Sequence, residues 1–176
     1  MVDRATVVAM ASPPPDLEVS TDPARLDREL IHRFLSRESY WALGIARETV
    51  DFAIDRSIPF GAYLDGDQVG FARAVTDAAT FAWIADVFVV RAHRGRGLGR
   101  RLVEAVLAHP EVRGARNVLL GTADAHGLYE RVGFRPLAHP ERYLNLRRPL
   151  REPYSPAPPS ERTGDPPAER FPDASA

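Results

Sequence analysis

The chain has 176 residues, of which 44% are hydrophobic, and a formal net charge of −1 at pH 7. This composition is enough for the core of one ordinary domain, so it excludes a chain that is disordered throughout, and the nearly neutral charge argues against a general nucleic-acid binder. All 23 basic residues are arginines and cysteine is absent, which excludes a catalytic lysine, disulfides, thiol nucleophiles and cysteine zinc sites.

Proline-rich stretches mark the ends of the folded domain. The segment SPPPD closes an N-terminal tail at residues 1–16, and residues 148–176 hold eight of the 16 prolines and few aliphatic side chains. Such a stretch cannot bury enough apolar surface to offset its ordering entropy, so we expect it to be disordered. The domain is predicted to span residues 17–147. No apolar run is long enough for a membrane span, so we expect a cytoplasmic protein.

The first half of the domain has the patterns of a strand, two helices and a hairpin. These elements are predicted, in this order, at residues 17–20, 22–37, 47–57 and 59–75. Asp22 is the expected N-cap of the first helix, and Pro23 occupies its first turn. The hairpin is expected to turn at DGDQ, residues 65–68.

The second half is predicted to alternate between strands and helices. Strands are expected at residues 80–90, 117–122, 134–137 and 142–148, and helices at residues 98–110 and 124–133. The strand at 80–90 is apolar along its whole length, which is typical of burial on both faces. The order of the elements indicates an α/β domain with a mixed sheet.

A loop rich in glycine and arginine, RAHRGRG at residues 91–97, joins that apolar strand to the next helix. Glycines let backbone N–H groups approach a phosphate closely, and a helix start adds partial positive charge, so the loop is typical of a phosphate site. It is not a P-loop, which needs a lysine, nor a dinucleotide fingerprint, because Gly95, Gly97 and Gly99 alternate. A solvated basic turn and an arginine-rich nucleic-acid module are the alternatives.

Two motifs resemble those of the GNAT superfamily of acetyl-CoA-dependent N-acetyltransferases. RGRGLG at residues 94–99 is similar to its pyrophosphate loop, Arg/Gln-x-x-Gly-x-Gly/Ala, and LYERVGF at residues 128–134 is similar to its L-Y-E-K-x-G-F segment. The resemblance covers residues 17–147 and departs from the usual pattern at Arg91 and Thr122. It implies a single GNAT-like α/β domain whose mixed, mostly antiparallel twisted sheet is flanked by helices.

The resemblance also implies an activity: transfer of an acetyl group from acetyl-CoA to a primary amine by direct attack in a ternary complex, without a metal. The pyrophosphate would lie on the N–H groups of the loop, and the pantetheine would pair with the preceding strand. The residues expected to bind acetyl-CoA are Val87, Phe88, Val89, Arg94, Gly95, Arg96, Gly97, Leu98, Gly99 and Arg100. A non-catalytic acyl-CoA-binding sensor or scaffold is the alternative function.

Tyr129 is the expected general acid of such a reaction, since a nearby phenol can protonate a departing thiolate. A tyrosine that only packs in the core is the alternative. Asp86, which comes directly before the cofactor strand, is preferred as general base over Asp77, Asp124 and His126. Asp124 is expected to cap the helix that carries Tyr129.

The acceptor is expected to contact the segment between the first two helices and the hairpin. Tyr40, Trp41 and Phe60 are the candidate residues for an apolar or cation-binding wall, and packing in the core is their alternative role. The expected partner is a small-molecule or peptide amine, with no nucleic acid and no membrane, and a homodimer is left open.

Overall fold

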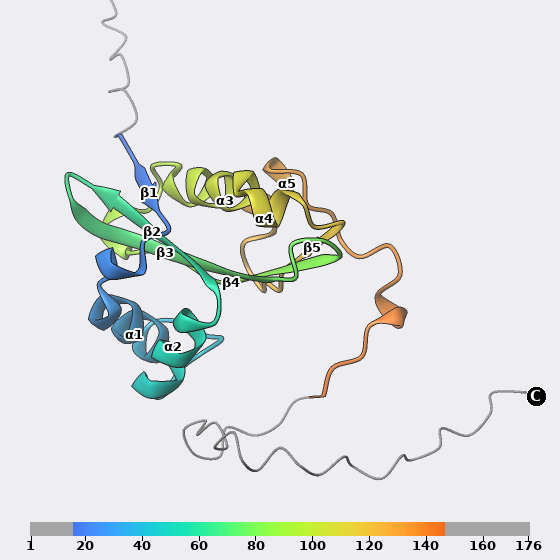
Figure 1. The fold of residues 1–176 in the computed structure, drawn as a ribbon, viewed down its shortest axis with the longest axis horizontal. Helices are drawn as coiled ribbons and strands as arrows, with labels where there is room; N and C mark the ends of the chain where they lie inside the picture. The colour runs from blue at the N-terminus through green and yellow to red at the C-terminus, as the bar shows by residue number, and fades with distance from the viewer. Residues whose placement is uncertain (1–15, 147–176) are drawn as a thin grey trace, which may run out of the picture.

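The computed structural model describes residues 16–146, so the tails predicted at 1–16 and 148–176 lie outside the described residues, apart from Asp16. Five strands form one sheet in sequence order (Figure 1). They are β1 (Glu18–Ser20), β2 (Ile58–Leu64), β3 (Asp67–Thr76), β4 (Phe81–Val89) and β5 (Asn117–Leu119). The first four pair antiparallel, and β5 runs parallel to β4, so the sheet is mixed and mostly antiparallel as predicted.

Helices cover both faces of the sheet. On one face lie α1 (Arg28–Arg37) and α2 (Arg47–Asp55), and on the other lie α3 (Leu98–Ala108) and α4 (Pro110–Arg113), with α5 (His126–Arg131) beside α3 (Figure 1). Because strand side chains alternate, each face has its own core. Phe71 and Phe88 pack toward α1 and α2, whereas Ala72 and Ile84 pack toward α3 and α4.

The helix predicted over residues 22–37 is two elements in the structure. Asp22 caps only a 3-10 turn at Pro23–Arg25, after which Leu26 is extended. The helix α1 begins behind a second cap, Asp27, whose Oδ1 accepts a hydrogen bond from the backbone N–H of Leu30 at 2.8 Å. Two aspartates five positions apart fit the same helix-start pattern, so the sequence did not distinguish them.

Replacing Asp27 with Ala should lower the free energy of unfolding by about 1 kcal/mol, because the first turn of α1 loses its side-chain acceptor. Asp22→Ala is the matched control and should cost less, since the 3-10 turn that Asp22 caps buries none of its residues. Urea unfolding of both variants, with the slope unchanged, measures the difference. A loss for Asp22→Ala as large as that for Asp27→Ala would contradict this assignment of the caps.

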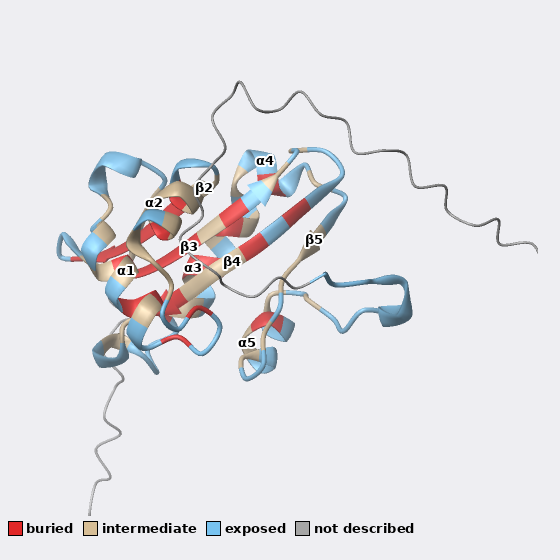
Figure 2. Cartoon of the chain, turned by 90° about the horizontal axis from the view of Figure 1, so that it is seen from below, coloured by how far each residue is buried: buried red, intermediate tan, exposed pale blue. Residues whose placement is uncertain are grey.

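Strand β4 is covered on both faces only over its second half. In its first half Ala82 and Ile84 are buried against α3 and α4, but Phe81 is 40% and Trp83 is 44% exposed on the other face. Figure 2 shows this alternation along β4. Helices α1 and α2 pack against Phe71 and Phe88, and none of the helices within residues 16–146 covers the other end. The predicted burial of the whole strand on both faces is therefore wrong for this half.

Strands β4 and β5 separate after three paired positions. The last pair is Trp83 with Leu119, where β5 ends, while β4 continues to Val89. A bulge lies in this unpaired half, because three steps of β4, from Ala85 to Phe88, match two steps of β3. Asp86 lies within the bulge at φ 54°. The sheet is therefore open on one side of the second half of β4.

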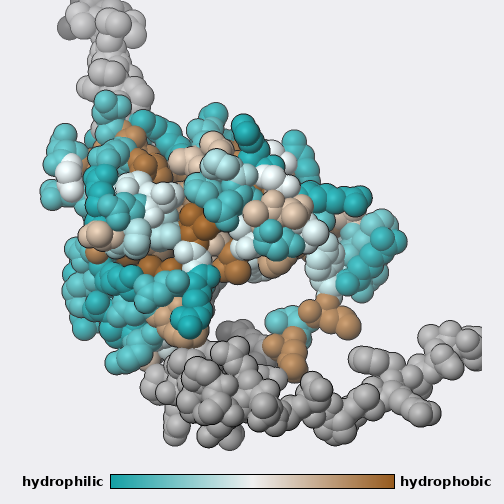
Figure 3. All heavy atoms as spheres, in the orientation of Figure 1, coloured by the Kyte–Doolittle hydropathy of each residue, from teal (hydrophilic) through white to brown (hydrophobic). Residues whose placement is uncertain are grey.

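The strands predicted at 134–137 and 142–148 are not formed within the described residues. A 3-10 turn at Pro140–Arg142 stands there instead, and Leu144 and Leu146 are 98% and 82% exposed. Pro136 and Pro140 cannot donate to a ladder, which explains the interruption. Figure 3 shows hydrophobic side chains on this segment, away from the body of the domain. Within residues 16–146, none of the helices has the length and apolar character needed to cross a membrane.

Candidate active site

Two cavities lie where β4 separates from β5, one of about 500 Å³ beside the glycine-rich loop and one of about 310 Å³ beside the first half of β4. We call them the loop cavity and the inner cavity. The two cavities are neighbours, because they share six lining residues. The residues common to both linings are Tyr40, Trp41, Val87, Asp124, Ala125 and Tyr129.

The loop cavity gathers nearly all residues predicted to bind acetyl-CoA. Its lining includes Val87, Phe88, Val89, Arg94, Gly95, Gly97, Leu98, Gly99 and Arg100. Arg96 is not part of that lining, and its guanidinium lies 3.2 Å from the ring nitrogen Nδ1 of His93. His93, Leu128 and Arg131 also line the cavity and were missed, although Leu128 and Arg131 stand one helical turn apart around Tyr129.

The helix α3 starts at the loop, with Gly97 as its N-cap at φ 76°, a left-handed conformation that only glycine adopts without strain. No side chain of the described residues caps this helix start, so its first N–H groups remain available to a ligand. At Gly99 a Cβ would come within 3.1 Å of Leu128 Cδ1, so the missing side chain lets α5 pack close to α3. Both glycines thus shape the loop cavity.

The arginines of the loop have different tasks. Arg94 donates from Nε to the carbonyl oxygen of Val89 at 2.9 Å, which fastens the loop to the end of β4. Its guanidinium lies 5.8 Å from the ring centroid of Phe34. Arg100 forms an ion pair with Glu104 at 2.7 Å on the exposed side of α3. Arg94 therefore holds the shape of the cavity as well as adding charge to it.

Tyr129 stands at the boundary between the cavities. It is 8% exposed, its ring packs edge-on against Phe134 at 5.8 Å, and its hydroxyl makes no hydrogen bond within residues 16–146. Burial, followed by the nearby Tyr40 and Asp124, raises the pKa of Tyr129 to about 12. The phenol therefore keeps its proton at neutral pH and faces both cavities.

Asp86 lines the inner cavity with both carboxylate oxygens already in use. Oδ2 accepts from Arg73 Nε at 2.5 Å in an ion pair that is largely buried, and Oδ1 accepts from the indole N–H of Trp41 at 3.1 Å. These two bonds fasten the bulge of β4 to β3 and to the segment between α1 and α2. The position agrees with the prediction that Asp86 lies at the site, but its contacts are those of a residue that orients others.

The other candidate bases fall in three different places. Asp77 is in the turn between β3 and β4, where a bond from the Thr80 hydroxyl and further bonds from backbone N–H groups lower its pKa. His126 is exposed and lines neither cavity. Asp124 lines both cavities. We expected Asp124 to cap α5, but this prediction is wrong. Ala125 is the N-cap residue, and the hydroxyl oxygen Oγ1 of Thr122 accepts a hydrogen bond from the Ala125 N–H.

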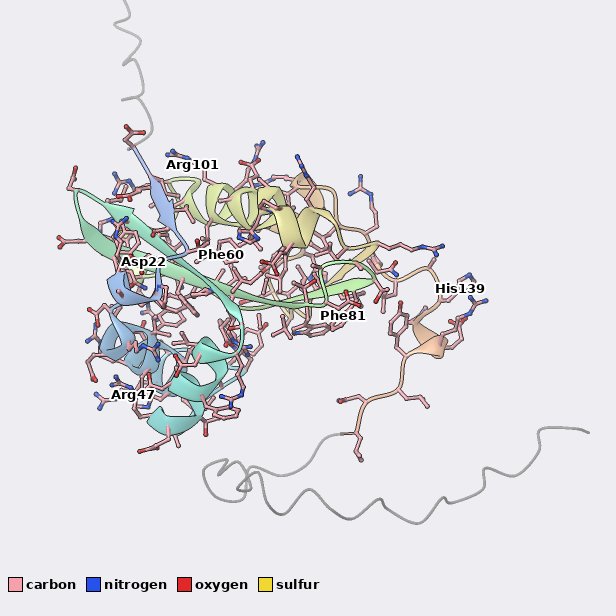
Figure 4. All side chains as sticks on the ribbon, in the orientation of Figure 1. Asp22, Arg47, Phe60, Phe81, Arg101 and His139 are labelled. Carbon is pink, nitrogen blue, oxygen red and sulfur yellow. The ribbon has the colours of Figure 1, made fainter. Side chains whose placement is uncertain are left out.

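Tyr40 and Trp41 reach the site from the segment between α1 and α2. The Tyr40 hydroxyl accepts from the backbone N–H of Ala123 at 2.8 Å, and the two rings meet edge-on at 5.0 Å. Phe60 is elsewhere: it is 1% exposed in the core beneath α3, on the opposite face of the sheet (Figure 4). Strand alternation turns its side chain away, so its predicted role in a substrate wall is wrong.

Several residues of the inner cavity were not found from the sequence, among them Arg73, Trp83 and Gly121. Arg73 and Trp83 lie on the face of the sheet that also holds Phe71, and no sequence pattern indicates that helices leave this part of the face open. Among the described residues, no group of three histidine, aspartate or glutamate side chains is arranged to hold a metal ion.

A mixed sheet that opens beside an uncapped, glycine-led helix start is the architecture of the GNAT acetyltransferases. The model of the acetyltransferase (GNAT) family matches residues 28–134. A Gibberella zeae protein that bears the name of an acetyltransferase is 32% identical over an alignment of 143 positions, which covers 68% of this chain and 80% of that protein. The chain therefore belongs to the GNAT acetyltransferase family and is an acyltransferase.

Solved structures agree with this assignment. A GNAT-family protein from Xanthomonas campestris is 48% identical, covers 78% of this chain and 96% of its own, and superposes with a TM-score of 0.74. A Deinococcus radiodurans protein is 26% identical, with a TM-score of 0.61 over 78% of this chain and 92% of its own. A Clostridium acetobutylicum protein crystallised with acetyl-CoA shares the fold, with a TM-score of 0.54 and 14% identity over 75% of this chain and 95% of its own.

Proposed function

We propose that this chain transfers an acetyl group from acetyl-CoA to a primary amine by direct attack, with both substrates bound together. The observation that supports this most is the pair of adjoining cavities with Tyr129 at their boundary. Two substrates can occupy two cavities at once and meet at one residue, which direct transfer requires. The loop cavity is assigned to acetyl-CoA, and the inner cavity to the amine.

The residues of the loop cavity fit the diphosphate of acetyl-CoA. A Cβ built at Gly95 or Gly97 would meet no atom within 4 Å, so the space in front of the loop is open. The uncapped N–H groups at the start of α3 can donate hydrogen bonds to the diphosphate, and the helix start and Arg94 both add positive charge there. The unpaired half of β4, from Val87 to Val89, offers backbone groups for the amides of the pantetheine.

Acetyl-CoA supplies an activated acetyl thioester at this site. The net reaction converts an ammonium group and a thioester into an amide, a thiol and one proton released to solvent. Tyr129 holds at its hydroxyl the proton that the leaving sulfur takes up, and regains one of the protons lost by the amine nitrogen. We assign the stabilisation of negative charge on the acetyl oxygen to a backbone N–H near Val89.

The two carboxylates at the site, Asp86 and Asp124, are assigned different roles. Asp86, which we expected to be the base, is bonded to Arg73 and Trp41, so we assign it the positioning of these two side chains. Asp124 has no hydrogen-bond or ion-pair partner within the described residues and borders both cavities. It is the carboxylate that holds the incoming ammonium and passes its proton to water.

Thermal unfolding with acetyl-CoA, followed by assays of CoA release with a panel of amines, tests the proposal. Acetyl-CoA at concentrations well above its Kd should raise Tm by ligand linkage, and at least one amine should release CoA. A Tm shift without CoA release for any amine would favour the non-catalytic acyl-CoA sensor. Salt-dependent DNA binding without a Tm shift would favour the nucleic-acid module.

A further inference from the structure

We infer that the inner cavity takes a small primary amine on a flat apolar body of about the size of one aromatic ring, without a carboxylate group. This inference rests on the proposed function, since it names the acceptor class of the same site. The size of the cavity, its aromatic walls and its charge each support one part of the description.

The size of the inner cavity favours a small molecule. Its volume of about 310 Å³ is at the lower end of the ~300–1,000 Å³ typical of small-molecule sites. A ligand there must also leave its amine at the boundary with the loop cavity, where Tyr129 stands. A compact acceptor that extends inward from this boundary therefore fits better than the end of a folded protein chain.

Aromatic side chains form the walls. Trp83 from β4 is 44% exposed, and Trp41 and Tyr40 from the segment after α1 are 40% and 56% exposed. Large aromatic surface left open inside a cavity gains free energy when a flat apolar ligand covers it. Because Trp83 lines only the inner cavity, whereas Trp41 and Tyr40 line both, the apolar body lies toward Trp83.

The charges of the inner cavity favour a cation at the boundary. Arg73 and Asp86 neutralise each other in their ion pair, which leaves the negative charge of Asp124. Asp124 and the faces of the aromatic rings both stabilise an ammonium group. A carboxylate on the acceptor would be repelled by Asp124 and would compete with Asp86 for Arg73, so amines are favoured over the corresponding amino acids.

Substitution of Gly121 can be used to reduce the volume of the inner cavity. A Cβ at this position would lie 3.9 and 4.0 Å from the six-membered ring of Trp83, an ordinary contact, so a larger side chain extends into the cavity without a clash at its root. Gly127 is the matched control, since a Cβ there meets nothing within 4 Å and the residue lines neither cavity. Gly121→Leu narrows the inner cavity, and Gly127→Leu adds the same bulk outside it.

The test measures kcat/KM by CoA release for three probes: 2-phenylethylamine, phenylalanine and propylamine. We expect 2-phenylethylamine to exceed phenylalanine by at least about tenfold, because of the carboxylate, and propylamine by a similar factor, because of the lost aromatic contact. Gly121→Leu should lower the value for 2-phenylethylamine by about tenfold or more, mainly through KM, and leave propylamine within about twofold. Gly127→Leu should change neither.

Three outcomes would overturn the inference while the proposed function stands: phenylalanine preferred over the amine, propylamine preferred over 2-phenylethylamine, or an equal loss for both amines in Gly121→Leu. CoA release from none of the amines, with acetyl-CoA still raising Tm, would overturn the transferase proposal and the inference with it. Unchanged Tm shifts with acetyl-CoA in both variants show that each one is folded.

Discussion

Replacing Tyr129 with Phe should lower the single-turnover rate of acetyl transfer by roughly 10²–10⁴-fold, the usual contribution of a general acid. The ring is kept, so its packing against Phe134 and the fold should be unchanged. The loss should appear in kcat rather than in KM, because the hydroxyl acts as charge develops on sulfur. Single-turnover measurement is needed, since product release can limit steady-state turnover.

The pH dependence offers a second readout of Tyr129. Because burial raises the pKa of Tyr129 to about 12, above the value of about 10 of a free tyrosine, the phenol stays protonated as the pH rises through 10. The single-turnover rate should therefore not fall between about pH 8 and 10 through loss of the Tyr129 proton.

Tyr143→Phe is the control for Tyr129→Phe. It removes the hydroxyl of a tyrosine that is 53% exposed and outside both cavities, and it should leave the single-turnover rate unchanged. A Tyr129→Phe variant as fast as the parent would show that another group protonates sulfur.

Gly97→Val should abolish most of the affinity for acetyl-CoA. At φ 76° a β-branched residue is strained, so we expect the start of α3 to shift. Its N–H groups then no longer have the geometry to donate hydrogen bonds to the diphosphate. The loss of one or two hydrogen bonds to a charged group, at ~1.5–3 kcal/mol each, corresponds to a rise in Kd of about tenfold or more. The Tm shift with acetyl-CoA, titrated over concentration, measures this rise.

Gly66→Val is the matched control for Gly97→Val. Gly66 has φ 90° in the turn between β2 and β3, away from both cavities, and a Cβ there meets nothing within 4 Å. Both variants bear a similar backbone strain, so both should unfold at lower temperature than the parent. Only Gly97→Val should lose the response to acetyl-CoA. An equal response in the two variants would mean that the loop does not bind the diphosphate.

Local patterns in the sequence were enough to locate most of the elements. Apolar periodicity predicted α3, which begins at Leu98 as expected, and the DGDQ turn predicted the hairpin of β2 and β3. Nearly all residues predicted from the end of β4 and the motif after it line the loop cavity, because they are close in the chain and one turn of backbone brings them together. Contiguous motifs of this kind can be predicted without tertiary information.

The inner cavity could not be predicted in the same way. Its residues come from β3, β4, α5, the segment after α1 and the segment after β5, and the sequence does not show which strand face the helices leave open. Trp83 was read as core because its strand is apolar throughout, and Phe60 was read as substrate wall because its strand face was unknown. The bulge at Asp86 also left no local signal, since aspartate commonly adopts a positive φ in turns rather than in strands.

The two hydrogen bonds from the segment between α1 and α2 have a consequence for engineering. Tyr40 is bonded to Ala123 on one side of the opening and Trp41 to Asp86 on the other, at the place where β4 and β5 share no ladder. The two sides of the opening are thus joined by two side chains of one short segment rather than by a β-ladder. On the proposed function, we therefore expect substitutions at Tyr40 and Trp41 to change acceptor selectivity while Arg94 still holds the glycine-rich loop at the end of β4.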